Sequence, residues 1–87
     1  MIPTRDSVRE HLQGVFRDVF EDDSLVISDE TTAREIPDWD SITHITLVVA
    51  AERAFSIQLR AAEVGKLGNV GQMVDLLLSR IGTSWVG

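Results

Sequence analysis

The sequence lacks cysteine altogether, since none of its 87 residues is of that type. This absence excludes disulfides and thiolate metal sites, so any thiol chemistry has to come from a prosthetic group. No apolar run approaches the roughly 18 residues of a membrane span, and the N-terminus has no basic region that leads into a hydrophobic one. We therefore expect a cytoplasmic protein that makes no membrane contact.

Basic residues are also scarce, with eight of them against fourteen acidic residues. A nucleic-acid surface needs clustered lysine and arginine to neutralise phosphates, so this balance argues against nucleic acid and favours a basic partner. Nine of the fourteen carboxylates fall between Asp18 and Asp40. The negative field should concentrate there, although most of these acids taken singly are expected to be solvated loop residues.

The length is that of one domain with one modest core. We treat residues 1–87 as a single domain whose core lies within about residues 4–81, followed by a loose tail at 82–87. Thr4 can cap a first helix, in which apolar residues recur at helical spacing and form one stripe. The stripe consists of Val8, Leu12, Val15, Phe16, Val19 and Phe20.

The segment from Glu21 to Trp39 shows no such pattern and is predicted to be a long loop, with Leu25, Ile27, Ile36 and Trp39 packed on the core. A loop of this length is unusual in a compact domain unless it has a function. Its acids do not form a calcium site, because the alternating ligands and central glycine of an EF-hand loop are missing. We therefore predict no metal site.

An acidic, turn-rich segment gives way to the most apolar run of the chain at Asp40 and Ser41. Both are residue types favoured at helix N-caps, so a helix is predicted to begin at one of them and to end at Ser56. The Ser41 hydroxyl would lie beside the positive end of the helix dipole, where an attached phosphoester is favoured. Ser41 is therefore a candidate attachment point for an anion.

Plotted at about 100° per residue, the helix after Ser41 has two apolar faces. The inward face contains Leu47, Val48, Ala51 and Phe55, and the outward stripe contains Ile42, Ile45 and Val49, bordered by Thr46, Glu52 and Arg53. A domain of this size cannot cover both faces, so we expect the outward stripe to be exposed and open to a partner. His44 falls on the inward side and is expected to be partly buried and hydrogen-bonded.

Two more helices are predicted after Phe55. Residues 61–64 can form a short helix, and Asn69 with Gln72 makes a start resembling a capping box for a last helix that ends at Gly82. The last apolar stripe consists of Val70, Met73, Val74, Leu77 and Ile81. The predicted fold is all-α, a small bundle of three main helices plus one short helix, with a long loop between the first and second helices.

Asp40-Ser41-Ile42, followed by the helix to Phe55 and by Ile57-Gln58-Leu59, resembles the Asp-Ser-Leu signature and second helix of acyl carrier proteins. The order of the other features agrees: an amphipathic first helix, a long loop before the serine, a short helix, and a last helix opened by Leu67-Gly68-Asn69-Val70. The resemblance spans about residues 4–81. A three-residue match alone is common by chance, so this context supports it.

The resemblance implies that a phosphopantetheinyl transferase uses coenzyme A to attach 4'-phosphopantetheine to Ser41, beside Asp40. Acyl groups would be held as thioesters on the added thiol. A monomer would present them to acyl-loading and acyl-transfer enzymes of fatty-acid, polyketide or related biosynthesis. The second helix would be the docking surface, so the expected partner-binding residues are Asp38, Trp39, Ile42, Ile45, Thr46, Val49, Glu52 and Arg53.

The second helix also departs from fatty-acid carriers. Thr43, Thr46 and Arg53 stand where acidic residues are common in the family, while Trp39 and Asp38 replace a frequent small residue and a frequent glycine. These differences favour a specialised, free-standing acyl carrier over a housekeeping one.

Two alternatives remain open from the sequence. A peptidyl or aminoacyl carrier would use the same serine chemistry, and a helical protein-protein interaction module would use the outward stripe with Ser41 only as a cap. An enzyme is not expected, because neither His44 nor His11 is matched by a nucleophile and acid in a recognisable motif. The predicted protein is a carrier without catalytic residues.

Overall fold

The computed structural model describes residues 4–36, 38–65 and 67–81. They form α1 (Arg5–Val19), the 3-10 turn η1 (Ala33–Glu35), α2 (Ser41–Phe55), the short α3 (Ala61–Val64) and α4 (Val70–Ile81). The predicted all-α class is confirmed, and these ranges contain no strand. The predicted loose tail at 82–87, with the helix end at Gly82, lies outside the described residues.

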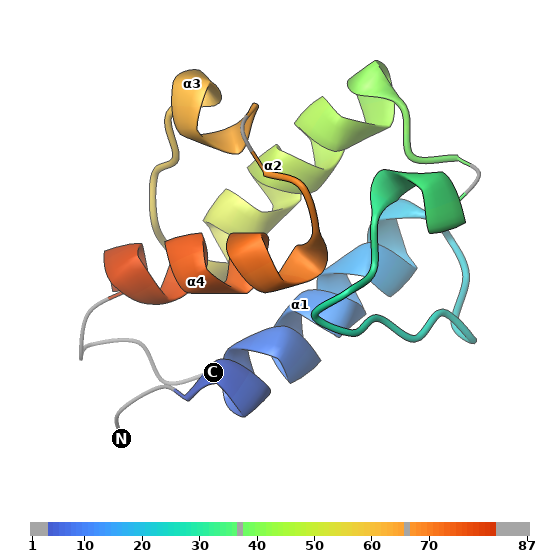
Figure 1. The fold of residues 1–87 in the computed structure, drawn as a ribbon, viewed down its shortest axis with the longest axis horizontal. Coiled ribbons are helices and arrows are strands. Elements are labelled where there is room, and N and C mark those ends of the chain that lie inside the picture. Colours follow the sequence, from blue (N-terminus) through green and yellow to red (C-terminus); the bar gives the residue numbers. More distant parts are fainter. Residues whose placement is uncertain (1–3, 37, 66, 82–87) are drawn as a thin grey trace.

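The first helix packs against both α2 and α4. Figure 1 shows the long connection between α1 and α2 on one side of this group of helices, with α3 near the opposite end. The connection is not irregular throughout as predicted, because η1 interrupts it just before α2. No helix in the described part of the chain is long and apolar enough to cross a membrane.

The core is built from one stripe on each of the three long helices. Its largest fully buried side chains are Phe16, Phe55, Leu12, Leu47, Met73 and Leu77. Ile27 and Ile36 of the connection are also buried, as predicted, whereas Val19, Phe20 and Val48 are only partly buried. Val19, the last residue of α1, and Phe20, its C-cap, pack against the edge of this core.

The backbone groups at the start of α4 bind both local side chains and the long connection. The predicted cap is present, since Asn69 Oδ1 accepts the backbone N–H of Gln72 at 2.9 Å. The connection adds two more bonds: the N–H of Val70 donates to the Thr31 carbonyl and that of Gly71 to the Asp29 carbonyl, each at 2.9 Å. Because the first N–H groups of a helix have no partner within it, the connection satisfies part of the start of α4.

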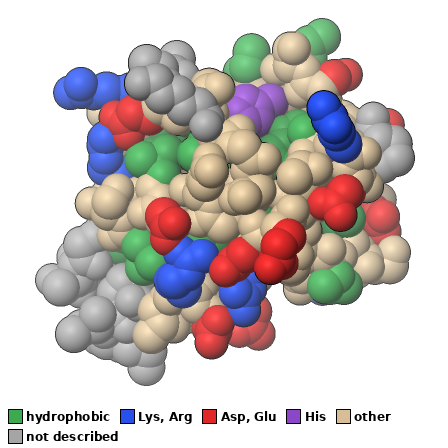
Figure 2. All heavy atoms as spheres, viewed as in Figure 1, with side chains coloured by type: hydrophobic (Ala, Val, Ile, Leu, Met, Phe, Trp, Pro, Cys, Tyr) green, Lys and Arg blue, Asp and Glu red, His purple; other side chains and the backbone are tan. Residues whose placement is uncertain are grey.

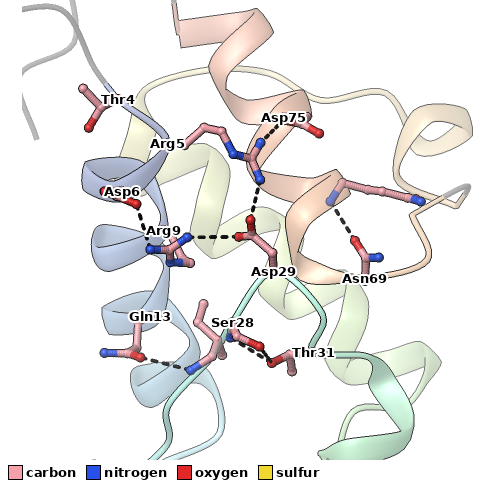
Figure 3. A network of polar contacts seen from close by, with 12 residues as sticks. Thr4, Arg5, Asp6, Arg9, Gln13, Ser28, Asp29, Thr31, Asn69 and Asp75 are labelled. Atoms are coloured by element: carbon pink, nitrogen blue, oxygen red, sulfur yellow. Dashed lines mark hydrogen bonds and ion pairs between the residues drawn. The ribbon is translucent and has the colours of Figure 1, made fainter.

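Asp29 also links the connection to α1 through its side chain (Figure 3). Its carboxylate accepts from Arg5 at 2.9 Å and from Arg9 at 3.1 Å, and Arg5 also pairs with Asp75 of α4. Hydrogen bonds from Arg5, then from Arg9, hold the pKa of Asp29 below its ordinary value. Figure 2 shows acidic and arginine side chains interspersed over this part of the surface. The connection is thereby fixed against α1 and α4.

Candidate functional site

Ser41 is the first residue of α2, and its side chain is exposed. The N-cap is Asp40, whose Oδ1 accepts the backbone N–H and the hydroxyl of Thr43, both at 2.9 Å. These bonds lower the pKa of Asp40, with the backbone N–H of Thr43 as the main cause. Because Asp40 caps the helix, the Ser41 hydroxyl is not needed for capping, and no hydrogen bond to it is found among the described residues.

The turn before Ser41 is anchored by Trp39, while Asp38 is exposed. The backbone N–H of Trp39 donates to the Ile36 carbonyl at 3.0 Å. Its indole ring packs edge-on against Phe16, with ring centroids 5.3 Å apart and planes at 88°. Trp39 therefore connects the approach to Ser41 directly to the core, which explains how a bulky residue replaces a small one here.

Trp39 also binds the first turn of α2. Its indole N–H donates to Nδ1 of His44 at 2.9 Å, and the two rings are nearly parallel, with centroids 5.9 Å apart and planes at 18°. His44 is half-buried and hydrogen-bonded, as predicted. The bond joins the residues on either side of Ser41 and so stiffens the backbone that presents it.

The outward stripe of α2 is exposed. Exposed fractions are 77% for Ile42, 65% for Ile45 and 41% for Val49, so the two-faced pattern read from the helical wheel is present in the structure. A shallow groove along this stripe is lined by Ile45, Thr46, Val49, Ala50 and Arg53. The role of these residues in partner binding stays a prediction.

Glu52 has a partner inside the chain. Its Oε2 accepts the backbone N–H of Leu59 at 2.9 Å, and its carbonyl accepts the N–H of Ile57 at 3.0 Å. Ser56, in the left-handed region at φ 55°, turns the chain between them. Glu52 thus fixes the segment after α2, and its predicted partner role, like that of Trp39, is untested.

Two neighbouring cavities lie beside the start of α2. The first, of about 440 Å³, is lined by Ser41 together with Ala33, Trp39, Asp40, His44, Val64, Gly65 and Leu67. The second, of about 250 Å³, is lined by His44, Ile45, Val48, Val49, Leu59, Val64 and Gly65. They share His44, Val64 and Gly65, so the cavity at the serine lies next to a more apolar one that is lined by α2 and the α3 segment.

The sequence interpretation missed both the Trp39–His44 hydrogen bond and the contribution of Val64 and Gly65 to the cavities. The wheel placed His44 inward, which was the one available signal for the first. Among the described residues no group of three or more histidine, aspartate or glutamate side chains could hold a metal ion.

Together, the fold and the site define a small helical domain that presents one serine hydroxyl at a capped helix start, next to an exposed apolar stripe. No protein-family model and no curated protein matches the sequence. Among solved structures, a holo acyl carrier protein from Geobacter metallireducens matches with a TM-score of 0.80 and 39% identity over 85% of each chain. The chain belongs to the acyl carrier protein family.

Proposed function

We propose that this protein carries acyl groups on a 4'-phosphopantetheine arm attached to Ser41 and presents them to enzymes of a fatty-acid, polyketide or related pathway. The observation that supports this most directly is the exposed Ser41 hydroxyl at the start of α2, which has no hydrogen bond among the described residues, in a chain that is similar to a holo acyl carrier protein of known structure. As in the family, the role is to hold and present a group rather than to transform it.

The residues around Ser41 fit such a group. The serine borders a cavity of about 440 Å³, and the first turn of α2 offers its positive end to a phosphodiester. Asp40 keeps the helix capped whether or not the hydroxyl is esterified. When attached, the arm supplies a terminal thiol on which acyl groups are held as thioesters.

The proposed partner surface is the outward stripe of α2, Ile42, Ile45 and Val49, with Thr46 and Arg53 beside it and Asp38 and Asp40 at its start. Exposed apolar side chains with a polar rim are typical of interaction sites. We propose that a phosphopantetheinyl transferase and acyl-loading and acyl-transfer enzymes bind here. Trp39 and Glu52 would support this surface through the internal contacts described above.

Intact mass after incubation with coenzyme A and a broad-specificity phosphopantetheinyl transferase tests the proposal. The parent should gain the mass of one arm, and Ser41→Ala should gain none. Because Asp40 supplies the cap, Ser41→Ala should cost at most about 1 kcal/mol and keep its helical signal. Ser79→Ala, an exposed serine on α4, is the matched control and should be modified like the parent. Full modification of Ser41→Ala would show that the site is wrong.

Loading assays then separate an acyl carrier from an aminoacyl carrier. The holo protein is offered acyl groups by an acyl-loading enzyme and amino acids by an adenylating enzyme. We expect acyl loading. Loading with amino acids alone would instead assign the chain to the peptidyl carriers.

A further inference from the structure

The hydrogen bond between Trp39 and His44 determines which nitrogen of the histidine carries its proton. An indole N–H can only donate, so Nδ1 of His44 must accept and cannot be protonated in this arrangement. A neutral imidazole has one N–H, which is then at Nε2. Trp39 therefore holds His44 in the form that donates from Nε2, and no partner for Nε2 is found among the described residues.

His44 lines both of the cavities beside α2. It lines the cavity that reaches Ser41 and also the apolar one, where it is the only polar side chain among the described lining residues; the others are Ile45, Val48, Val49, Leu59, Val64 and Gly65. A prosthetic arm or acyl group that extends from Ser41 into the apolar cavity therefore passes His44. A half-buried donor that has no acceptor among the described residues and lies among apolar side chains is suited to bind an acceptor oxygen of a molecule that enters the cavity.

We propose that His44 donates a hydrogen bond from Nε2 to a carbonyl oxygen of the chain carried by Ser41. That oxygen belongs either to the arm, as an amide carbonyl, or to the acyl group, as a thioester or 3-oxo carbonyl. His44 acts as a positioning residue, and Trp39 acts through it by fixing the tautomer. The proposal rests on the proposed function, because it requires Ser41 to be the attachment site.

NMR spectroscopy of the loaded protein tests this. Three forms are compared with the apo protein: the holo form, the hexanoyl form and the 3-oxohexanoyl form, with ¹³C at the carbonyl carbons of the arm and acyl group and ¹⁵N in the histidines. We expect the Nε2–H tautomer of His44 in the apo form. In at least one loaded form the Nε2–H resonance should shift and exchange with water about fivefold more slowly, the factor that one net hydrogen bond gives. The carbonyl that responds identifies its acceptor.

His44→Asn is the first variant, because an asparagine amide oxygen can take the place of Nδ1 as acceptor for Trp39 but leaves nothing at Nε2. The responding carbonyl should return to its shift in the free arm, and His11→Asn on α1 should leave it unchanged. Trp39→Phe, which keeps an aromatic ring against Phe16, is the second variant. It should release His44 into a mixture of tautomers.

The outcomes separate this proposal from the function on which it rests. A response in the holo form assigns the donor to the arm, and a response only in acyl forms assigns it to the acyl group; either supports the proposal. An Nδ1–H tautomer in the apo form, or loaded forms in which neither Nε2–H nor any carbonyl responds, would overturn it while leaving the carrier function intact. If the protein keeps its apo mass after incubation with the transferase, both the His44 proposal and the carrier function are overturned.

Discussion

The side of the molecule where α1, α4 and the long connection meet differs from the outward side of α2 in what its side chains contact. On the first side, Arg5 and Arg9 both bind Asp29, and the carbonyl of the same residue caps α4. On the second side, Ile42 and Ile45 are more than half exposed and Arg53 has no ion pair within the described residues. On the first side, charged side chains bind one another within the fold. On the second side, apolar side chains are exposed to solvent.

This difference separates residues that maintain the fold from residues available to other molecules. A charged network that joins three segments stabilises the native arrangement of the connection. Exposed isoleucines contribute nothing comparable to folding, since their side chains stay largely in water. Substitutions on the two sides should therefore affect different measurements, stability on the first and association on the second.

The largest effect should come from placing a charge on the inward face of α2. Phe55→Asp puts an unpaired carboxylate into the core, where the side chain is 1% exposed, and should cost about 4 kcal/mol or more or prevent folding. Val49→Asp on the outward stripe should cost only about 0.5 to 1 kcal/mol and weaken transfer to or from partner enzymes. Thermal melts of the two variants measure this difference in stability. If Val49→Asp melts as low as Phe55→Asp, the outward stripe is needed for the core and is not a free surface.

A second pair of variants tests the contact between the connection and α4. A Cβ on Gly71 would lie 3.0 Å from the Asp29 carbonyl oxygen and 3.1 Å from its Cβ. Asp29 cannot easily move away, because it is bonded through its backbone and its side chain. Gly71→Ala should therefore destabilise the fold by about 1 to 3 kcal/mol.

The matched control is Gly14→Ala in α1, where an added Cβ meets nothing within 4 Å. There the usual helix preference for alanine should stabilise the protein by about 0.5 to 1 kcal/mol. Denaturant unfolding measures both variants. If Gly71→Ala stabilised the protein as much as Gly14→Ala does, the connection would not restrict the space at the start of α4.

The helices could be predicted because their signals are local. The caps at Thr4, Asp40 and Asn69 act within three residues, and the apolar stripes follow the helical period, so the three long helices begin where the sequence predicts. The exposure of the outward stripe of α2 also follows from periodicity combined with the small size of the domain.

The contacts of the long connection could not be predicted in the same way. The hydrogen bond that the Gly71 N–H donates to the Asp29 carbonyl spans about forty residues and involves backbone atoms that every residue except proline possesses. The cavities likewise depend on where the turn around Val64 and Gly65 packs on α2. Such features arise from tertiary packing, for which a single sequence contains no periodic signal.

The ion pairs of Asp29 with Arg5 and Arg9 should make the stability of the fold depend on pH. Because the pKa of Asp29 is lowered in the folded state below its unfolded value of about 4, its carboxylate stabilises the fold above that pH. The contribution is lost as pH falls through the lowered pKa. Asp29→Asn should therefore melt below the parent at pH 7, and the gap should close as the pH falls below about 4.

Asp38→Asn is the control for this experiment, since Asp38 is exposed and makes no ion pair within the described residues. Its melting temperature should follow that of the parent at every pH. A gap for Asp29→Asn that persists unchanged in acid would contradict the ion-pair explanation and indicate a different structural cause.

The smallest effect should come from the charge beside the outward stripe. Arg53 is exposed and lines the shallow groove with Ile45 and Val49, so Arg53→Glu should leave stability nearly unchanged. A rim charge acts mainly on the rate of encounter, and salt screens it. The variant should change the rate of modification by a phosphopantetheinyl transferase at limiting concentration a few-fold at low salt, and much less at about 0.5 M salt, where the Debye length is only about 4 Å. Arg60→Glu makes the same charge change at an exposed position outside the stripe and should alter the rate less. If the two variants respond alike at every salt concentration, the effect arises from net charge, and the transferase does not dock where Arg53 lies.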